Sequence, residues 1–194
     1  MNQMGLAGLS RVGRVHFVMA WVLCVAALLL VVATWLPGPR KVPFGAVGVV
    51  FVAIFPVVGV ALASVLFSEG GRSLLGRGNG GRMARFVWSL PTGLKCSYAV
   101  VFATLLLAMT AGGEARDTKT DEFGSHYYTR WNNTTLRSER VALSEAEYHE
   151  ASKAQARVFA SGAALFHAVG GFLVLVAASP AMPRPGVEGS KRVA

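Results

Sequence analysis

The sequence predicts an all-α membrane protein, a bundle of four transmembrane helices with a small extracytoplasmic cap between the third and fourth helices. Of its 194 residues, 53% are hydrophobic and 15% are charged, whereas about a quarter of the residues in a soluble domain are charged. Four apolar stretches are each long enough to cross a hydrocarbon core of about 30 Å. A polar segment rich in aromatic residues separates the last two stretches.

The charge distribution also favours a membrane protein. Lys and Arg outnumber Asp and Glu by 19 to 10, giving a net charge of +9. The basic residues flank the apolar stretches, which is typical of membrane proteins. Nucleic-acid binding requires a continuous basic stripe, so we expect no nucleic-acid partner.

The first predicted transmembrane helix covers residues 15–36 and follows a short cytoplasmic lead, residues 1–14. A signal peptide is the alternative, because the start of the chain is basic and an apolar run follows. That run is longer than the 7–15 residues of a signal-peptide core, and no A-x-A-like cleavage site follows it. We therefore predict a retained helix, with Trp35 at the far membrane interface.

The second predicted transmembrane helix covers residues 44–67 and has Pro56 in its middle. Proline lacks the N–H that would bond to the carbonyl of Val52, so a kink is expected there. The kink either shapes helix packing or contributes to a gate or ligand site, as discontinuous membrane helices do.

Residues 68–90 are predicted to form a flexible cytoplasmic loop rich in Arg and Gly. Its G-x-G-x-x-G match is not flanked by the strand and helix of a nucleotide-binding unit. Basic residues near anionic headgroups each contribute about 1 kcal/mol to membrane binding, so we expect lipid contacts here. The arginines concerned are Arg72, Arg77, Arg82 and Arg85.

The third predicted transmembrane helix, residues 91–111, contains a charged residue, Lys95, one turn from its start. A lysine in that position can extend its ammonium group to the headgroups. An ion-pathway role is the alternative, since ionisable residues inside a membrane are often functional.

One continuous helix is predicted from Ser144 to Ser179, because no proline occurs before Pro180. Ser144 and Glu147 form an S-x-x-E capping box at its start. Its first half is charged and lies outside the membrane, residues 158–179 form the fourth transmembrane helix, and residues 180–194 form a disordered cytoplasmic tail.

The external cap is predicted to cover residues 112–157, including the start of the last helix. We expect a small folded unit with a hairpin that turns at Asn132-Asn133. Its aromatic rings form either a small core or interfacial anchor, or a partner-binding surface, where Tyr and Trp are enriched. The candidate binding residues are His126, Tyr127, Tyr128, Trp131 and Tyr148.

Small residues recur at every fourth position along the last helix and in a shorter seam on the second helix. Such residues let two helices approach closely. These seams either close the bundle or join two copies of the chain. The packing residues are Gly59, Ala63, Ala156, Ala160, Ala164, Ala168 and Gly171.

No motif in the sequence indicates catalysis. His167 lies near the middle of the fourth helix, where it either bonds to a neighbouring helix or relays protons. His16 and His167 differ too much in depth to share a haem. Glu145 and His149 are one helical turn apart, and His126 could approach them, but no tight zinc-ligand spacing is present, so we expect no metal. We also expect no cofactor, and two free buried thiols.

Four spans place both termini on one side of the membrane. The short connectors on that side carry four basic residues, against two on the other side. Short loops weigh most in the positive-inside rule, so we expect cytoplasmic termini and an extracytoplasmic cap in the plasma membrane.

The segment HYYTRWNNTTLRSERVALSEAEYHEASKAQARVFASGAALFHAVGG, residues 126–171, combines an aromatic loop, an S-x-A-E-Y helix start and the last span. It resembles a segment of uncharacterised four-span membrane proteins of high-GC Gram-positive bacteria. The resemblance covers about the last 60 residues, implies a bacterial membrane protein and implies no activity.

These observations predict a non-enzymatic accessory protein whose cap contacts an envelope component or a partner membrane protein. The alternative is a small transporter or channel that uses the bundle interior around His167 and Pro56.

Overall fold

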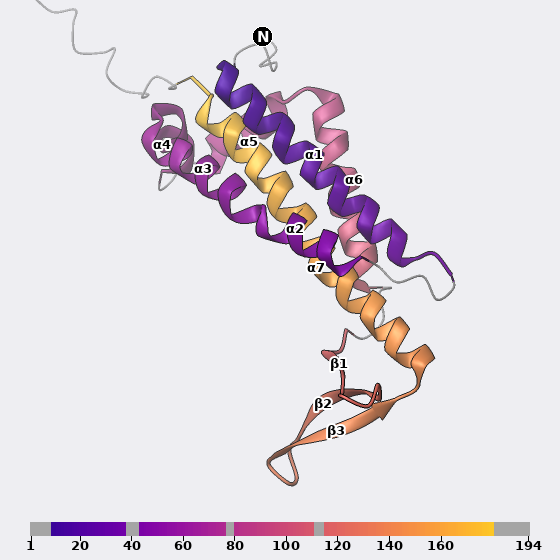
Figure 1. The fold of residues 1–194 in the computed structure, drawn as a ribbon. Helices are drawn as coiled ribbons and strands as arrows, with labels where there is room; N and C mark the ends of the chain where they lie inside the picture. Colours follow the sequence, from indigo (N-terminus) through magenta and orange to yellow (C-terminus); the bar gives the residue numbers. More distant parts are fainter. Residues whose placement is uncertain (1–8, 38–42, 77–79, 111–114, 181–194) are drawn as a thin grey trace, which may run out of the picture.

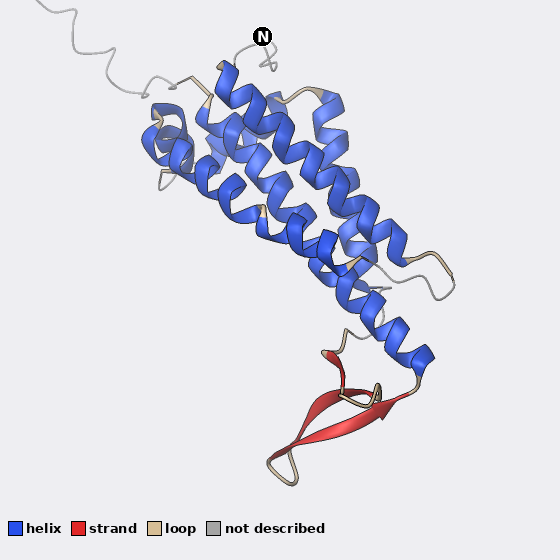
Figure 2. Ribbon diagram, in the orientation of Figure 1, coloured by secondary structure: helices blue, strands red, loops and turns tan. Residues whose placement is uncertain are grey.

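The computed structural model describes residues 9–37, 43–76, 80–110 and 115–180. These residues are mostly helical, with one small three-stranded sheet (Figures 1 and 2). Four helices are long and apolar enough to cross a membrane, as predicted. They are α1 (Arg11–Thr34), the segment Phe44–Phe67 formed by α2 (Phe44–Val52) and α3 (Ile54–Phe67), α6 (Thr92–Thr110) and α7 (Glu145–Ala177).

Helix α7 organises the molecule. It runs for 33 residues without a break, which confirms the predicted continuous helix. The predicted capping box is present at its start: Ser144 Oγ accepts a 3.3 Å hydrogen bond from Glu147 N, and the Glu147 carboxylate accepts one of 2.8 Å from Ser144 N. Helix α7 packs against α1, α2, α3, α6 and the short helix α4 (Glu69–Leu75), and then extends beyond them to the sheet (Figure 1).

The most extensive helix pair is α1 with α7. On α1 the buried positions alternate in steps of three and four: Phe17, Ala20, Cys24, Ala27, Val31 and Thr34. This spacing places all of them on one stripe of the helix. On α7 the small residues Ala156, Ala160, Ala164, Ala168 and Gly171 are all buried. Small side chains on both helices allow the backbones to approach closely.

The second membrane-length segment is interrupted at Ala53, between α2 and α3. The interruption lies three residues before Pro56, whose ring nitrogen cannot donate to the carbonyl of Val52. The buried side of α3 is formed by Ile54, Val57, Ala61 and Val65.

Residues 68–90 differ from the predicted flexible loop, because the described part forms two short helices, α4 and α5 (Gly80–Ser89). Helix α4 begins at Ser68, whose hydroxyl accepts a 3.0 Å hydrogen bond from Gly71 N. Gly70 lies directly against the carbonyl of Ser179 at the end of α7, where a Cβ atom would clash. Helix α5 buries Phe86 beside Phe172 of α7, with ring centroids 5.9 Å apart. Packing on α7 therefore outweighs the low helix propensity of these glycines.

The cap contains strands, so the all-α prediction holds only for the bundle. The cap sheet consists of β1 (Thr118–Thr120), β2 (His126–Asn132) and β3 (Arg137–Leu143), paired antiparallel in the order β1-β2-β3. Aromatic and β-branched residues in β2 and β3 favour extended structure. The predicted hairpin is present and turns after Asn132, whose side-chain oxygen accepts a 2.8 Å hydrogen bond from Thr134 N.

Some predictions concern residues outside the described ranges. They are the start of the cytoplasmic lead, part of the connector after the first span, Arg77 in the arginine-rich segment, the first residues of the cap and the C-terminal tail after residue 180.

Candidate functional site

The cap sheet is attached to the first turns of α7 by one of its two faces, which we call the helix face. The His126 ring stacks on Tyr148 of α7, with centroids 3.8 Å apart and an angle of 9° between the planes. Thr118 Oγ1 lies 3.3 Å from Ser152 Oγ, a hydrogen-bonding distance. Side chains of a strand point alternately to opposite faces. In β3 the helix-face residues Glu139, Val141 and Leu143 are half-buried, while the residues between them are exposed.

The opposite face of the sheet, which we call the open face, points away from α7. Strand alternation and the β2–β3 register, in which Thr129 pairs with Arg140 and Trp131 with Ser138, define its members. They are Lys119, Tyr127, Thr129, Trp131, Ser138, Arg140 and Ala142. Trp131 remains 58% exposed. A large, rigid aromatic surface is therefore presented to the surroundings.

The open face is electropositive near its centre. The Arg140 guanidinium lies over the Tyr127 ring, 4.9 Å from its centroid. Glu139, the one acid of residues 126–143, projects to the helix face, where Asn132 Nδ2 and Thr135 Oγ1 donate to its carboxylate at 2.6 and 3.3 Å. Lys119, by contrast, is paired with Asp117 at 3.3 Å. Among the described residues, no carboxylate forms an ion pair with Arg140, so it is the unneutralised cation of this face.

Exposed apolar side chains also lie at the two turns of the sheet. Phe123, in the turn between β1 and β2, is 92% exposed, and Leu136, in the turn between β2 and β3, is 70% exposed. The Asp121 carboxylate accepts hydrogen bonds from Phe123 N and Ser125 N at 3.0 and 2.8 Å, which fixes the first turn. Phe123 is thus held outward by an ordered turn.

The structure divides the five predicted binding residues between the two faces. Tyr127 and Trp131 lie on the open face. His126 and Tyr148 stack on each other between the sheet and α7, and Tyr128 lies on the helix face under Arg116, 4.6 Å from the guanidinium. Sequence reasoning missed Arg140. The alternation in RSERVAL, combined with a turn at Asn132, would have placed it opposite Thr129.

The described residues of the cap offer no evident metal centre. His149 Nε2 lies 3.6 Å from Glu145 Oε1, but His126 is turned to Tyr148, and its Nδ1 lies 3.0 Å from Thr120 Oγ1. Within the described ranges, no group of three or more His, Cys, Asp or Glu side chains could hold a metal ion. The two cysteines are free, and Cys24 is buried while Cys96 is exposed.

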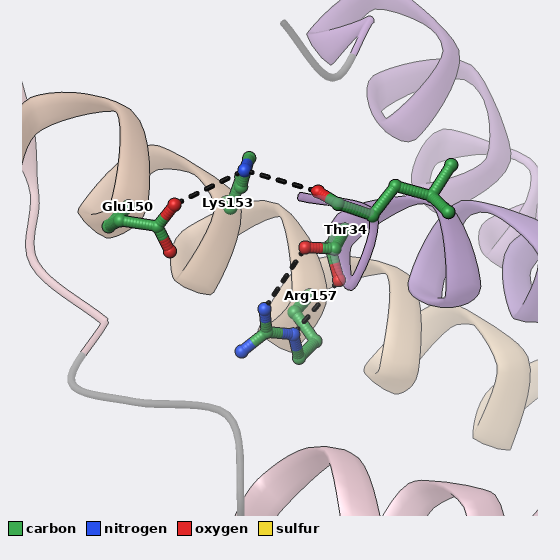
Figure 3. A network of polar contacts seen from close by, with 5 residues as sticks. Thr34, Glu150, Lys153 and Arg157 are labelled. Atoms are coloured by element: carbon green, nitrogen blue, oxygen red, sulfur yellow. Dashed lines mark hydrogen bonds and ion pairs between the residues drawn. The ribbon is translucent and has the colours of Figure 1, made fainter. Parts of the chain in front are cut away.

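Two basic side chains of α7 fix the helix at the level where it leaves the bundle (Figure 3). Arg157 donates from Nε to Thr34 Oγ1 at 2.9 Å and from Nη2 to Thr34 O at 3.3 Å, and its guanidinium lies 4.7 Å from the Trp35 ring centroid. Lys153 Nζ donates to Leu36 O at 3.3 Å and pairs with Glu150 at 3.2 Å. The C-terminal carbonyls of a helix lack intrahelical donors and carry partial negative charge, so these cations complete the end of α1.

The cap sheet is therefore carried on a helical stem, which we define as Glu145–Arg157. At 1.5 Å per residue the stem is about 18 Å long. Its base is tied to α1 through Arg157, and its tip to the sheet through the capping box and the ring of Tyr148. The open face thus has a fixed position relative to the bundle.

Inside the bundle, two histidines bond to backbone carbonyls on either side of the interruption at Ala53. His167 Nε2 lies 3.0 Å from Val50 O, and His16 Nε2 lies 2.9 Å from Val57 O. His167 is fully buried, and its Nδ1 has no hydrogen-bond partner among the described residues. Both histidines therefore hold α2 and α3 against the α1–α7 pair.

The other predicted membrane residues lie at the surface of the bundle. Lys95 Nζ donates to Trp88 O at 3.2 Å and lies 5.6 Å from the Trp88 ring centroid, so it points to the end of its helix. Gly59 is exposed, with no atom within 4 Å of the position of a Cβ atom, and Ala63 is half-buried. The predicted seam of Gly59 and Ala63 therefore meets no other helix at Gly59 within the part of the chain that the structure describes.

Comparison of the chain with protein-family models, with curated proteins and with solved structures found no match. The functional argument therefore starts from the open face, its rigid support and its charge.

Proposed function

We propose that this protein is a non-enzymatic accessory protein of a bacterial plasma membrane, which contacts an envelope component or a partner membrane protein through its external cap. The observation that carries this proposal is the open face of the cap sheet, which presents Trp131, Tyr127 and Arg140 on a stem tied to the bundle. Trp, Tyr and Arg are the residues that most often dominate binding energies at interfaces.

The rigidity of the cap supports a binding role. A surface that is already ordered loses little conformational entropy when it binds. The Asp121 turn, the His126–Tyr148 stack and the capping box at Ser144 order the sheet without a partner. Exposed Trp131 and Phe123 contribute little to that internal order, which leaves them free for contact.

We further propose that the termini are cytoplasmic and that residues 112–157 are extracytoplasmic. The support is the excess of arginines in residues 68–90 over the basic residues of the first connector. The described arginines of that segment, Arg72, Arg82 and Arg85, would contact anionic headgroups, and Trp88 is 82% exposed beside them. Single cysteines at Ser138 and at Ser73, in a chain whose native cysteines are serines, should react with an impermeant maleimide in intact cells at Ser138 alone.

The binding role is tested in intact cells with a photo-crosslinking amino acid at Thr129. Partner capture by the parent chain is compared with capture by the Trp131→Ala chain. We expect this change to remove the captured species without lowering the amount of folded protein. The matched control is Trp88→Ala, because Trp88 is also exposed (82%, against 58% for Trp131) but lies on α5, at the end of the bundle opposite the sheet. Equal capture by the parent chain and Trp131→Ala would contradict the proposal.

A small transporter or channel is the second candidate. The observation that favours it is the pair of histidine–carbonyl bonds around the interrupted helix, since discontinuous helices form binding sites in transporters. Proteoliposomes containing the purified protein should then conduct ions or solutes, and His167→Ala should change the flux. Absence of flux, or flux that His167→Ala leaves unchanged, would remove this candidate.

A second copy of the chain is a further partner to be tested. Gly59 is exposed on the side of α3 opposite the α7 contact, where close approach of another helix is sterically open. Native mass spectrometry of the protein extracted from its membrane would show a dimer, and Gly59→Leu would abolish it.

A further inference from the structure

We infer that the ligand of the open face is an anionic polysaccharide. The inference rests on the proposed binding function of the cap and names the chemistry of its partner. It follows from the order of side chains along β2 and β3, from the charge of the face and from the height of the sheet above the bundle.

The open face has the length and composition of an extended binding strip. Tyr127, Thr129 and Trp131 alternate along one strand, so about 14 Å separates the two aromatic positions at 3.4 Å per residue. The faces of aromatic rings carry partial negative charge, which attracts the partially positive C–H groups on the face of a pyranose ring. Trp131, which is 58% exposed, offers such a face, whereas Arg140 covers one face of the Tyr127 ring. Hydroxyl groups of Thr129 and Ser138 lie between and beside the rings. A few consecutive sugar units match this strip.

The charge of the face selects an anionic chain. Arg140 pairs with Thr129 across the strands, so its backbone position lies between those of the two aromatic residues. The Arg140 guanidinium lies 4.9 Å from the Tyr127 ring centroid, and it forms no ion pair with a described residue, so its N–H groups are available to a ligand. A guanidinium edge binds a carboxylate or sulfate group with two parallel hydrogen bonds. The nearest hairpin acid, Glu139, is held on the other face by Asn132 and Thr135.

The height of the sheet argues against the protein's own bilayer as the ligand. Trp35 and Arg157 stack at the end of α1, a level at which aromatic residues meet the membrane interface. The sheet contacts the stem at Ser152 and Tyr148, which lie about 8 and 14 Å along the helix beyond Arg157. A headgroup layer is only about 5–8 Å thick on each side, so the open face stands clear of it.

The composition of the face also distinguishes a polysaccharide from a protein partner. The centre of a protein–protein interface is mainly apolar, and Arg is the charged residue that is enriched there. Here the most exposed apolar side chains, Phe123 and Leu136, lie at the turns and not at the centre of the open face. Alternation of rings, hydroxyl groups and a cation is suited to a polar, hydroxyl-rich and negatively charged chain.

The test uses the full-length protein in nanodiscs of zwitterionic lipid, titrated by calorimetry. The probes are oligogalacturonate and a heparin-derived oligosaccharide as carboxylate and sulfate chains, and an uncharged oligoglucoside of the same length as the neutral control. We expect at least one anionic chain to bind and the neutral chain to bind at least about tenfold more weakly. Loss of a charge-assisted hydrogen-bonding group typically weakens binding about ten- to a hundredfold, so Arg140→Gln should show a loss of that size.

The matched control is Arg130→Gln, on the same hairpin but on the helix face, opposite Glu139. It should retain the parent affinity within about threefold, whereas Trp131→Ala should weaken binding. Two results would each overturn the inference: no binding of either anionic chain below about 1 mM, or equal losses for Arg140→Gln and Arg130→Gln.

Crosslinking from Thr129 in intact cells separates this inference from the proposed function. If a protein is captured, if this capture depends on Trp131, and if neither anionic chain binds, the polysaccharide inference is overturned and the accessory function remains. If neither capture nor binding occurs, both proposals fail.

Discussion

Arg157 of α7 donates a 2.9 Å hydrogen bond from its Nε atom to the hydroxyl of Thr34, the last residue of α1 (Figure 3). Both residues are buried, and the same threonine hydroxyl donates to Val31 O at 2.6 Å. Helix α1 has no basic residue in its own last turn. The positive charge that complements the end of α1 is therefore supplied by the neighbouring helix, at the base of the stem that carries the cap.

Thr34→Val should destabilise the α1–α7 pair. Valine has nearly the shape of threonine but cannot accept the hydrogen bond from Arg157 Nε, so the guanidinium loses this bond while its Nη2 bond to Thr34 O can remain. Hydrogen bonds to charged groups contribute about 1.5–3 kcal/mol, and we expect a loss of that size in thermal or denaturant unfolding of the detergent-solubilised protein. Thr104→Val is the matched control, because the Thr104 hydroxyl on α6 donates to Val100 O in its own helix and, among the described residues, to no other helix; the stability of this variant should stay within about 0.5 kcal/mol of the parent. Equal stabilities for the two variants would contradict a tie at Thr34.

Gly70→Ala should displace α4 from the end of α7. The added methyl group would overlap the carbonyl and the hydroxyl of Ser179. Overpacking of this kind typically costs about 1–3 kcal/mol, to be measured as a fall in unfolding temperature. Gly48→Ala on α2 is the control, because nothing lies within 4 Å of its Cβ position and alanine favours helix by about 1 kcal/mol. Gly70→Ala matching Gly48→Ala in stability would show that α4 is not packed on α7.

The features predicted correctly from sequence are those that depend on local patterns. The continuous helix α7 follows from the absence of a breaker between Ser144 and Ser179 and from the capping box. The interruption near Pro56 follows from a missing N–H group, and the hairpin turn from Asn132. Each depends on a few adjacent residues, so the sequence alone contains the necessary information.

The features missed depend on contacts between distant segments. Helix α4 forms because Gly70 fits against Ser179, more than a hundred residues away. Arg157 and Lys153 read as solvated positions of a charged helix, yet they are buried because the last carbonyls of α1 face them. Gly59 lies on the exposed side of α3, because the buried stripe of that helix runs through Val57 and Ala61. The site was located in part: Tyr127 and Trp131 face outward, but strand alternation turns His126 and Tyr128 toward the helix face.

Tyr148→Ala should loosen the cap sheet without unfolding the bundle. The His126–Tyr148 stack is one of the contacts between the sheet and the stem, and aromatic pairs contribute about 0.5–1.5 kcal/mol beyond the area they bury. We expect faster amide hydrogen exchange in β2 and β3 and unchanged exchange in α1. Trp131→Ala removes a larger ring from the open face, where it is 58% exposed, and should leave exchange in the sheet unchanged. Slow exchange throughout the sheet in the Tyr148 variant would mean that other contacts suffice to order it.

The capping box should make the junction between β3 and α7 sensitive to acid. The backbone N–H and the hydroxyl of Ser144 donate hydrogen bonds to the Glu147 carboxylate at 2.8 and 2.7 Å and lower the pKa of this group. A lowered pKa in the folded state stabilises the protein fully above the unfolded value, near 4.3, and this stabilisation is lost as the pH falls through the folded value. Thermal unfolding followed by circular dichroism should therefore show an unfolding temperature that falls as the pH drops below about 4.3. Glu147→Gln has an amide oxygen that still accepts hydrogen bonds but does not titrate, so this part of the pH dependence should vanish. A parent chain and a Glu147→Gln chain with identical acid profiles would show that other carboxylates, and not the capping box, govern the acid response.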